Sequence, residues 1–271
     1  LGGLFLYKTK KMDLAGIISC AGVFSVFFGF MYGSFFGFED VLKAIWLKPM
    51  NQMMDVPLVG RLNAVFVIAI GFGMFIILIC MVFNIINSIR RGDTEKTWFD
   101  SNAVAGLVFY GSIVLTIGLF ISGKKLPAAA ILVIMFGVPL LLMFLKEPLT
   151  NLVEKKSEIL PEQKGMFFVQ SFFELFEVLL SYLSNTLSFL RIGAFAVSHA
   201  AMMEVVLMLA GATNGGNPNW IVVVLGNIFV CAMEGLIVGI QVLRLEYYEI
   251  FSRFYAGNGR EFKPFMKAAH K

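Results

Sequence analysis

The chain has 271 residues, of which 58% are hydrophobic and only 15% are charged, and its formal net charge at pH 7 is +4. Soluble domains carry about 25% charged residues, so this composition, with a mean hydropathy of +0.81, excludes an ordinary soluble domain. No basic stripe interleaved with aromatic residues occurs, which argues against a nucleic-acid partner. The three cysteines and two histidines lie far apart, so we expect packing thiols, no metal site and no cofactor.

Apolar runs of about twenty residues, the length that crosses about 30 Å of hydrocarbon, recur along the chain. They predict an all-α, polytopic transmembrane helix bundle with spans at 14–37, 62–89, 102–122, 127–145, 166–212 and 219–255. Residues 1–7 resemble the end of a further span, since lysines follow at once and no initiator Met precedes them. We therefore expect a piece of a longer polypeptide, with 1–165 as a first helix subdomain and 166–271 as a pair of helices and a tail.

Basic residues are about three times as frequent on one side of these spans as on the other. The positive-inside rule places that side in the cytoplasm. It holds residues 8–11, 90–101, 146–165 and the C-terminal tail. We expect a multi-pass protein with a cytoplasmic C-terminus, and we expect Glu174 and Glu249 to be solvated at the cytoplasmic interface.

Three glycines in the first span, Gly29, Gly33 and Gly37, form a GxxxGxxxG ridge. Small residues at this spacing let helix backbones approach closely in lipid. The ridge therefore predicts helix packing rather than a functional site.

The last two spans are unusually long. As single helices, 166–212 would extend about 69 Å and 219–255 about 54 Å, against about 30 Å of hydrocarbon. Each must therefore tilt steeply, bend or project into water.

Both long spans carry polar residues at intervals of three or four, the spacing that shares one helix face. On the first span these are Glu174, Glu177, Ser181, Ser184, Ser188 and Arg191, with Asn185 beside them. On the second they are Asn227, Cys231, Glu234, Gln241, Arg244 and Tyr248. Each set is a polar track on an otherwise apolar helix.

The buried charges in these tracks are costly. A charge at the bilayer centre costs about 2.5–3.5 kcal/mol on insertion scales, and arginine cannot escape by losing its proton. One alternative is that Arg191 and Arg244 pair with Glu177 and Glu234 as static bridges, while the serines bond to carbonyls of their own helix. Ionisable clusters of this size inside membranes usually mark ion pathways.

Depth separates the members of the cluster. The first long span runs outward from the cytoplasm, so Glu177 lies about 21 Å on the cytoplasmic side of Arg191 and His199 about 12 Å on the external side. The second runs inward, which places Glu234 about 15 Å external to Arg244. The pattern predicts two offset half-channels, one open to each face, with the arginines between them. The candidate ion-translocation residues are Arg191, Arg244, Glu177, Glu234, His199, Ser184, Ser188, Asn185 and Gln241.

The segment Leu183–Arg191 (LSNTLSFLR), followed by Ser198-His199-Ala200, resembles the a (or I) subunit of rotary V-type and V/A-type ATPases. Met233-Glu234-Gly235, Leu243-Arg244-Leu245-Glu246-Tyr247 and the tail from Phe254 to Phe265 continue the similarity in order. The short external loops look more like prokaryotic members than vacuolar ones, which favours the cytoplasmic membrane of a prokaryote.

This resemblance implies a stator subunit beside a rotating proteolipid ring, with peripheral stalk and central rotor subunits as further partners. The arginine matching Arg191 would face the ring, and the residues matching Glu177, Glu234 and His199 would line half-channels for H⁺ or Na⁺. Some relatives carry serine three residues after the position of Glu234, where this chain has Ile237. The chain would be a non-catalytic subunit of an ATP-driven pump or synthase, since it has no P-loop.

Two other classes stay open from the sequence. A secondary transporter with a charged midplane site usually shows internal repeats and helices broken by Gly or Pro at the centre. The two long spans contain no internal proline and no repeat of the six-span pattern is found. A structural membrane anchor is the second alternative, in which Arg191 would have no part in ion flux.

Overall fold

The computed structural model describes residues 2–10, 13–33, 38, 45–46, 53–56, 60–124, 127–153, 164–212, 218–255 and 257. Five helices within these ranges are long and apolar enough to cross a membrane, or six if a bent pair counts as one span. Two long helical spans lie at the C-terminal end of the chain. The predicted fold class, a polytopic helix bundle with a long C-terminal pair, is confirmed.

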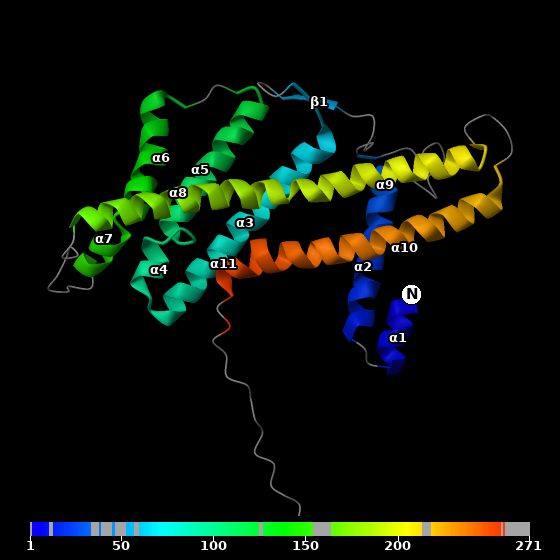
Figure 1. Ribbon diagram of the computed structural model, residues 1–271, viewed down its shortest axis with the longest axis horizontal. Coiled ribbons are helices and arrows are strands. Elements are labelled where there is room, and N and C mark those ends of the chain that lie inside the picture. The colour runs from blue at the N-terminus through cyan, green and yellow to red at the C-terminus, as the bar shows by residue number, and fades with distance from the viewer. Residues whose placement is uncertain are drawn as a thin grey trace, which may run out of the picture.

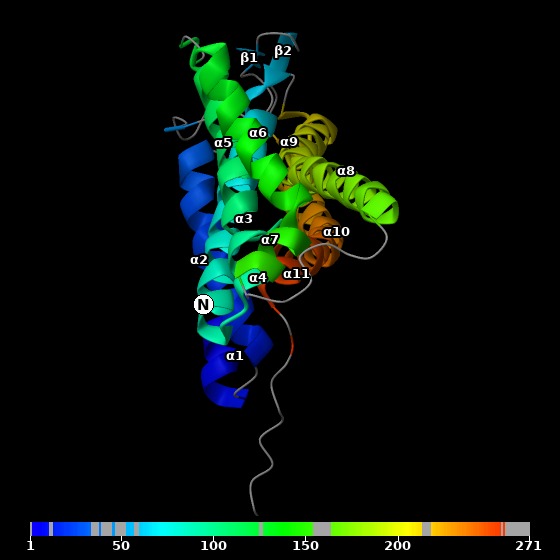
Figure 2. The same ribbon diagram turned by 90° about the vertical axis from the view of Figure 1, so that its left-hand side faces the viewer.

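The first half of the chain supplies helices that run up and down the molecule in Figures 1 and 2. They are α1 (Gly2–Lys10), α2 (Asp13–Tyr32), α3 (Ala64–Arg91), α5 (Val104–Ile121) and α6 (Ala129–Phe144). The central helix, α3, is well delimited: Asn63 accepts a hydrogen bond from the Val65 amide at 3.1 Å, and Gly92 ends the helix with a left-handed φ of 76°. Such caps satisfy terminal backbone groups that the helix itself leaves free.

The segments between these helices hold more structure than the sequence predicted. A hairpin of β1 (Met53–Val56) and β2 (Gly60–Asn63) precedes α3, and short helices α4 (Thr94–Trp98) and α7 (Lys146–Val153) follow α3 and α6. The axes of α6 and α7 meet at 73°. Figure 1 shows α4, α7 and α11 at one end of the molecule and the hairpin at the other.

Gly33 ends the first helix and so interrupts the predicted glycine ridge. Gly33 has a φ of 68°, a left-handed conformation that ends α2 at Tyr32, and Gly37 lies outside the described residues. An αL glycine commonly terminates a helix in this way. The first span is therefore shorter than 14–37, and Gly33 serves as a helix stop.

The C-terminal pair consists of α8 (Lys164–Ser188), α9 (Leu190–Leu209), α10 (Trp220–Leu245), a π-helical turn (Glu246–Phe251) and α11 (Ser252–Phe254). Only Phe189 separates α8 from α9, so Gly165–Leu209 forms one span of 45 residues, and Trp220–Phe254 forms another of 35. Their lengths are about 68 and 52 Å. Figure 1 shows both lying side by side across the upright helices, the steep tilt that their lengths demand.

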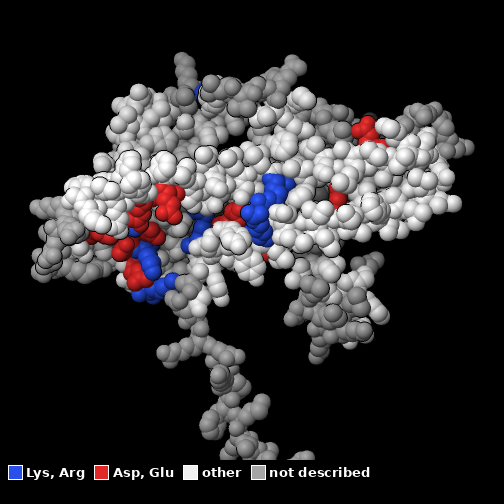
Figure 3. Space-filling view, in the orientation of Figure 1, with Lys and Arg blue, Asp and Glu red and all other residues white. Residues whose placement is uncertain are grey.

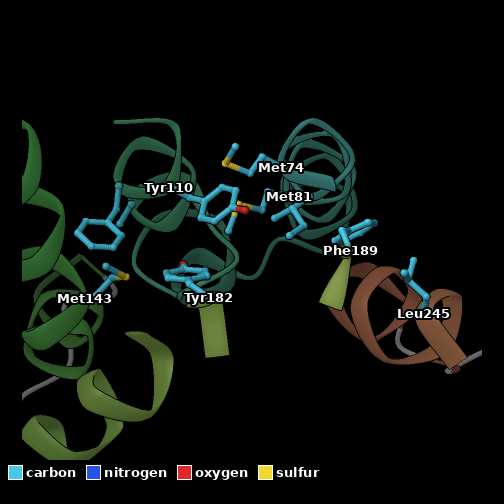
Figure 4. Close-up of a cluster of buried hydrophobic side chains, with 10 residues drawn as sticks. Met74, Met81, Tyr110, Met143, Tyr182, Phe189 and Leu245 are labelled. Atoms are coloured by element: carbon cyan, nitrogen blue, oxygen red, sulfur yellow. The ribbon is translucent and has the colours of Figure 1, made fainter. Parts of the chain in front are cut away.

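The main core lies where α8 crosses α3 and α5. It is built from Met74, Ile77, Met81, Ala105, Phe109, Tyr110, Met143, Tyr182, Phe189 and Leu245 (Figure 4). The long pair contributes only three of these side chains, and most of its apolar surface stays exposed. Within this chain Cys80 is buried, but Cys20 and Cys231 are exposed, so the expectation of three packing thiols is wrong for two of them.

Candidate intramembrane site

A close crossing of α9 over α3 sets the direction of Arg191. A Cβ added to Gly73 of α3 would lie 2.2 Å from Cγ of Phe189, and one added to Gly193 would lie 2.9 Å from Cδ1 of Phe66. Phe189 and Gly193 are four residues apart, so they share the face of the helix that contacts α3. Arg191 lies midway between them and therefore projects away from α3.

One nitrogen of the Arg191 guanidinium has no hydrogen-bond acceptor among the residues that the structure describes. This nitrogen, Nη1, is also buried. A buried charged donor without an acceptor carries a desolvation penalty that nothing offsets. Within the described ranges, neither Arg191 nor Arg244 forms an ion pair with Glu177 or Glu234, which does not favour the static-bridge alternative.

Glu234 has a different partner, His199 of α9. Its Oε2 lies 2.5 Å from the His199 Nδ1, with side-chain exposures of 17% for the glutamate and 48% for the histidine. The sequence placed both residues on the external side of the arginines but did not pair them. The contact joins two titratable groups across the α9–α10 interface.

The α9–α10 pair keeps one antiparallel register. Gly226 faces Val206, where an added Cβ would meet the valine at 2.4 Å, and Glu234 faces His199. Because both helices advance by about 1.5 Å per residue in opposite directions, extending the register places Gln241 level with Arg191. Arg244 then lies within one helical turn of that level, about 4 Å further along α10.

The predicted residues of α8 lie on a more open surface. Glu177 and Ser184 are exposed, while Asn185 and Ser188 are partly buried. Asn185 donates a hydrogen bond to Ser181 Oγ at 3.3 Å. The side chains of Ser184 and Ser188 bond to none of the described residues, so bonding to their own helix carbonyls is not what holds them.

Charge is sparse on the broad face formed by the long pair. Figure 3 shows that face as mostly uncharged, with a basic patch near the junction of α8 and α9 and the end of α10, and a mixed-sign cluster near α4 and α7. The cluster includes an ion pair between Lys146 and Glu174, at a pocket lined also by Asp100 and Ser171. The sequence had predicted that Glu174 is simply solvated, whereas the structure shows it paired with Lys146.

Two charged residues at the end of the second long span are buried, which the sequence did not predict. Glu249 is 5% exposed and Arg253 is 7% exposed, although Glu249 was expected to be solvated and Arg253 was counted with the cytoplasmic tail. Both were judged only by their place near the cytoplasmic end of the span, whereas their burial comes from packing of the π-helical turn Glu246–Phe251 and of α11 against α3. Within the described ranges, no group of three or more His, Cys, Asp or Glu residues could hold a metal ion.

The fold and the site together define a class: a polytopic membrane protein whose two long, slanting helices carry Arg191 and Arg244, neither of which forms an ion pair with the residues that the structure describes. Comparison with known proteins shows which family it resembles. Residues 146–267 match the model of the V-type ATPase 116 kDa subunit family. The A-type ATP synthase subunit I of Saccharolobus solfataricus is 44% identical over 100 residues, which cover 34% of this chain and 14% of the relative.

Two further relatives extend the similarity. Subunit I of the A-type ATP synthase of Pyrococcus horikoshii is 25% identical over 272 residues, covering 95% of this chain and 37% of the relative. The human V-type proton ATPase 116 kDa subunit a 3 is 32% identical over 129 residues, covering 43% of this chain and 15% of the relative. The C-terminal part of the chain, residues 146–267, is therefore similar to the V-type ATPase 116 kDa subunit family, and the chain spans 14–37% of the length of these relatives.

Proposed function

We propose that this chain is the membrane part of a stator subunit of a rotary A/V-type ATPase and provides two half-channels, for H⁺ or Na⁺, beside a proteolipid ring. The unsatisfied Nη1 of Arg191 carries the proposal. Arg191 as a whole is only partly buried and lies on the helix face turned away from α3, so a small movement of its side chain would bring the guanidinium to an acceptor from outside this chain. A ring carboxylate is the acceptor whose charge and geometry suit a guanidinium.

The mechanism is electrostatic. A neutral, ion-loaded carboxylate on the ring rotates through lipid until it meets Arg191, where the positive charge favours its ionised form. The released ion leaves through one half-channel, and the carboxylate is reloaded from the other after further rotation. The fixed charge of Arg191 also repels a cation that would otherwise cross directly between the half-channels.

The external half-channel is assigned to His199 and Glu234. Their contact at 2.5 Å joins the two side-chain types best suited to accept and pass on a proton. Both lie on the external side of Arg191, and the amide of Gln241 lies level with it. A charge crossing a potential of 100 mV exchanges about 2.3 kcal/mol, which gives the rotation its direction.

The cytoplasmic half-channel is assigned to the open face of α8. Glu177, Ser184, Asn185 and Ser188 supply a carboxylate, two hydroxyls and an amide along that face, on the cytoplasmic side of Arg191. The exposed apolar side chains around them suit contact with lipid and a proteolipid ring. Peripheral stalk and central rotor subunits complete the proposed assembly.

The test is ATP-driven ion uptake in inverted membrane vesicles that contain the complete assembly. Arg191→Ala should abolish coupled uptake with normal amounts of assembled complex, and Arg191→Lys should recover little, because an ammonium lacks the planar donor pair. Arg90→Ala, which removes an exposed arginine at the end of α3, is the matched control and should pump normally. Normal pumping by Arg191→Ala would refute the proposal and favour an anchor, and substrate flux without any ring would favour a secondary transporter.

A further inference from the structure

A buried arginine at the cytoplasmic end of the second long span has three partners. The Nη1 of Arg253 donates to Asn102 Oδ1 at 2.9 Å, and its Nε donates to the Glu249 carbonyl at 3.2 Å. The centre of the guanidinium lies 5.8 Å from the middle of the Tyr182 ring. Because Arg253 is only 7% exposed, these contacts are shielded from water and correspondingly strong.

Two partners of Arg253, Tyr182 and Asn102, form further hydrogen bonds. The Tyr182 hydroxyl donates to the Ser101 carbonyl, and Asn84 Nδ2 donates to the Asn102 carbonyl at 3.0 Å. One guanidinium therefore connects α11, at the end of the second long span, to α8 and to the residues just before α5, while Asn84 adds a link to α3. The carboxylate of Glu249, also buried, lies one turn before Arg253, and its Oε2 has no hydrogen-bond partner among the described residues.

This network is placed symmetrically with respect to the two membrane arginines. Tyr182 precedes Arg191 by nine residues on the first long span, and Arg253 follows Arg244 by nine residues on the second. We propose that Arg253 is a positioning residue: its contacts with Tyr182 and Asn102 fix how far the two long spans are slid along each other, and so the level of Arg244 relative to Arg191. The inference rests on the proposed function, in which both arginines must meet the same ring.

The remaining contacts between α9 and α10 explain why the contacts of Arg253 are needed to fix the register. The buried contact between α9 and α10 is the apolar cluster of Met203, Val206 and Val230. Apolar packing is non-directional, and antiparallel helices can shift by one turn, about 5.4 Å, and repack. The His199–Glu234 contact is directional, but in the proposed mechanism its protonation changes in every cycle, so it cannot hold the register throughout.

Cysteine cross-linking in vesicles of the complete assembly, with the three native cysteines replaced by serine, reads the register directly. Met203→Cys is combined with a cysteine at Val230, its present neighbour, or at Asn227 or Met233, which are about one turn to either side. With Arg253 intact, the product with position 230 should dominate. Arg253→Met should shift the product ratio towards one of the other pairs by about tenfold, the bias that one hydrogen bond to a charged group supplies.

Asn102 provides the matched controls. Asn102→Leu removes the acceptor and should shift the ratio as Arg253→Met does, while Asn102→Asp retains an acceptor and should keep the original product. The double variant with Arg253→Met should shift the ratio no further than either single variant, because both remove the same contact. Asn102→Leu also keeps the test decisive if Arg253→Met fails to assemble.

A second readout connects the register with transport. The number of ions taken up per ATP hydrolysed should fall at least about twofold in Arg253→Met and in Asn102→Leu, with assembly unchanged and with recovery in Asn102→Asp. An unchanged product ratio in both variants would overturn the inference and leave the proposed function standing, as would a shifted ratio with normal coupling. Failure of the proposed function itself is read separately, from pumping by Arg191→Ala in the same vesicles.

Discussion

Replacing Gly73 with alanine should displace Arg191 without touching it. The added methyl carbon would lie 2.2 Å from Cγ and 2.5 Å from Cβ of Phe189. Ordinary carbon–carbon contacts are about 3.5–4.0 Å, so α9 and α3 must separate locally by more than about 1 Å. Phe189 cannot swing aside, because it is fully buried in the main core.

The cost can be stated from this geometry. Overpacking of a well-filled core destabilises by about 1–3 kcal/mol, and each kcal/mol lowers Tm by about 2–4 °C in a chain of this size. We expect Gly73→Ala to lower the Tm of the purified protein by several degrees. A displacement of about 1 Å at a functional group can reduce turnover as much as 100-fold, so coupled ion uptake should fall at least about tenfold.

Gly71 provides the matched control, two residues away on the same helix, where an added Cβ meets nothing within 4 Å. Gly71→Ala should change neither Tm nor ion uptake. Combining Gly73→Ala with Phe189→Leu should recover part of the lost stability, because the smaller side chain makes room for the methyl group. Wild-type Tm and uptake in Gly73→Ala would show that the crossing does not orient Arg191.

Two further predictions concern the α9–α10 interface. His199→Ala and Glu234→Ala should each slow coupled uptake, and the double variant should be little worse than either, because both changes remove one contact; additive losses in the measured rates would contradict this pairing. Gly226→Ala should lower Tm, because its Cβ would lie 2.4 Å from Val206, whereas Gly235→Ala, with nothing within 4 Å, should not. Equal Tm values for the two glycine variants would disprove the close packing.

Hydropathy predicted the long helices because span length is a property of consecutive residues. The expected span at 102–122 corresponds to α5 at Val104–Ile121, and the expected spans at 166–212 and 219–255 correspond to the two slanting spans. Arg191 was singled out because a permanent charge in an apolar run is costly wherever the fold places it. Composition and spacing were sufficient for these inferences.

Contacts between distant segments were beyond the same reasoning. Nothing in the sequence of α9 or α10 specifies that His199 meets Glu234, since this depends on the register of two helices. Glu249 and Arg253 were misplaced because a position near the end of a span does not reveal that the π-helical turn and α11 pack against α3. Gly73 carried no signal either, because a lone glycine reveals a close crossing only when the partner helix is known.

The most direct measurement is a map of the complete assembly in a bilayer, at a resolution that shows side chains. The account predicts that a ring carboxylate, or water held by it, reaches the Nη1 of Arg191 during rotation, with the two charged groups approaching within about 4–6 Å in one rotary state. A map in which another residue of this same chain satisfies Arg191, or in which Arg191 faces lipid away from the ring in every state, would contradict it.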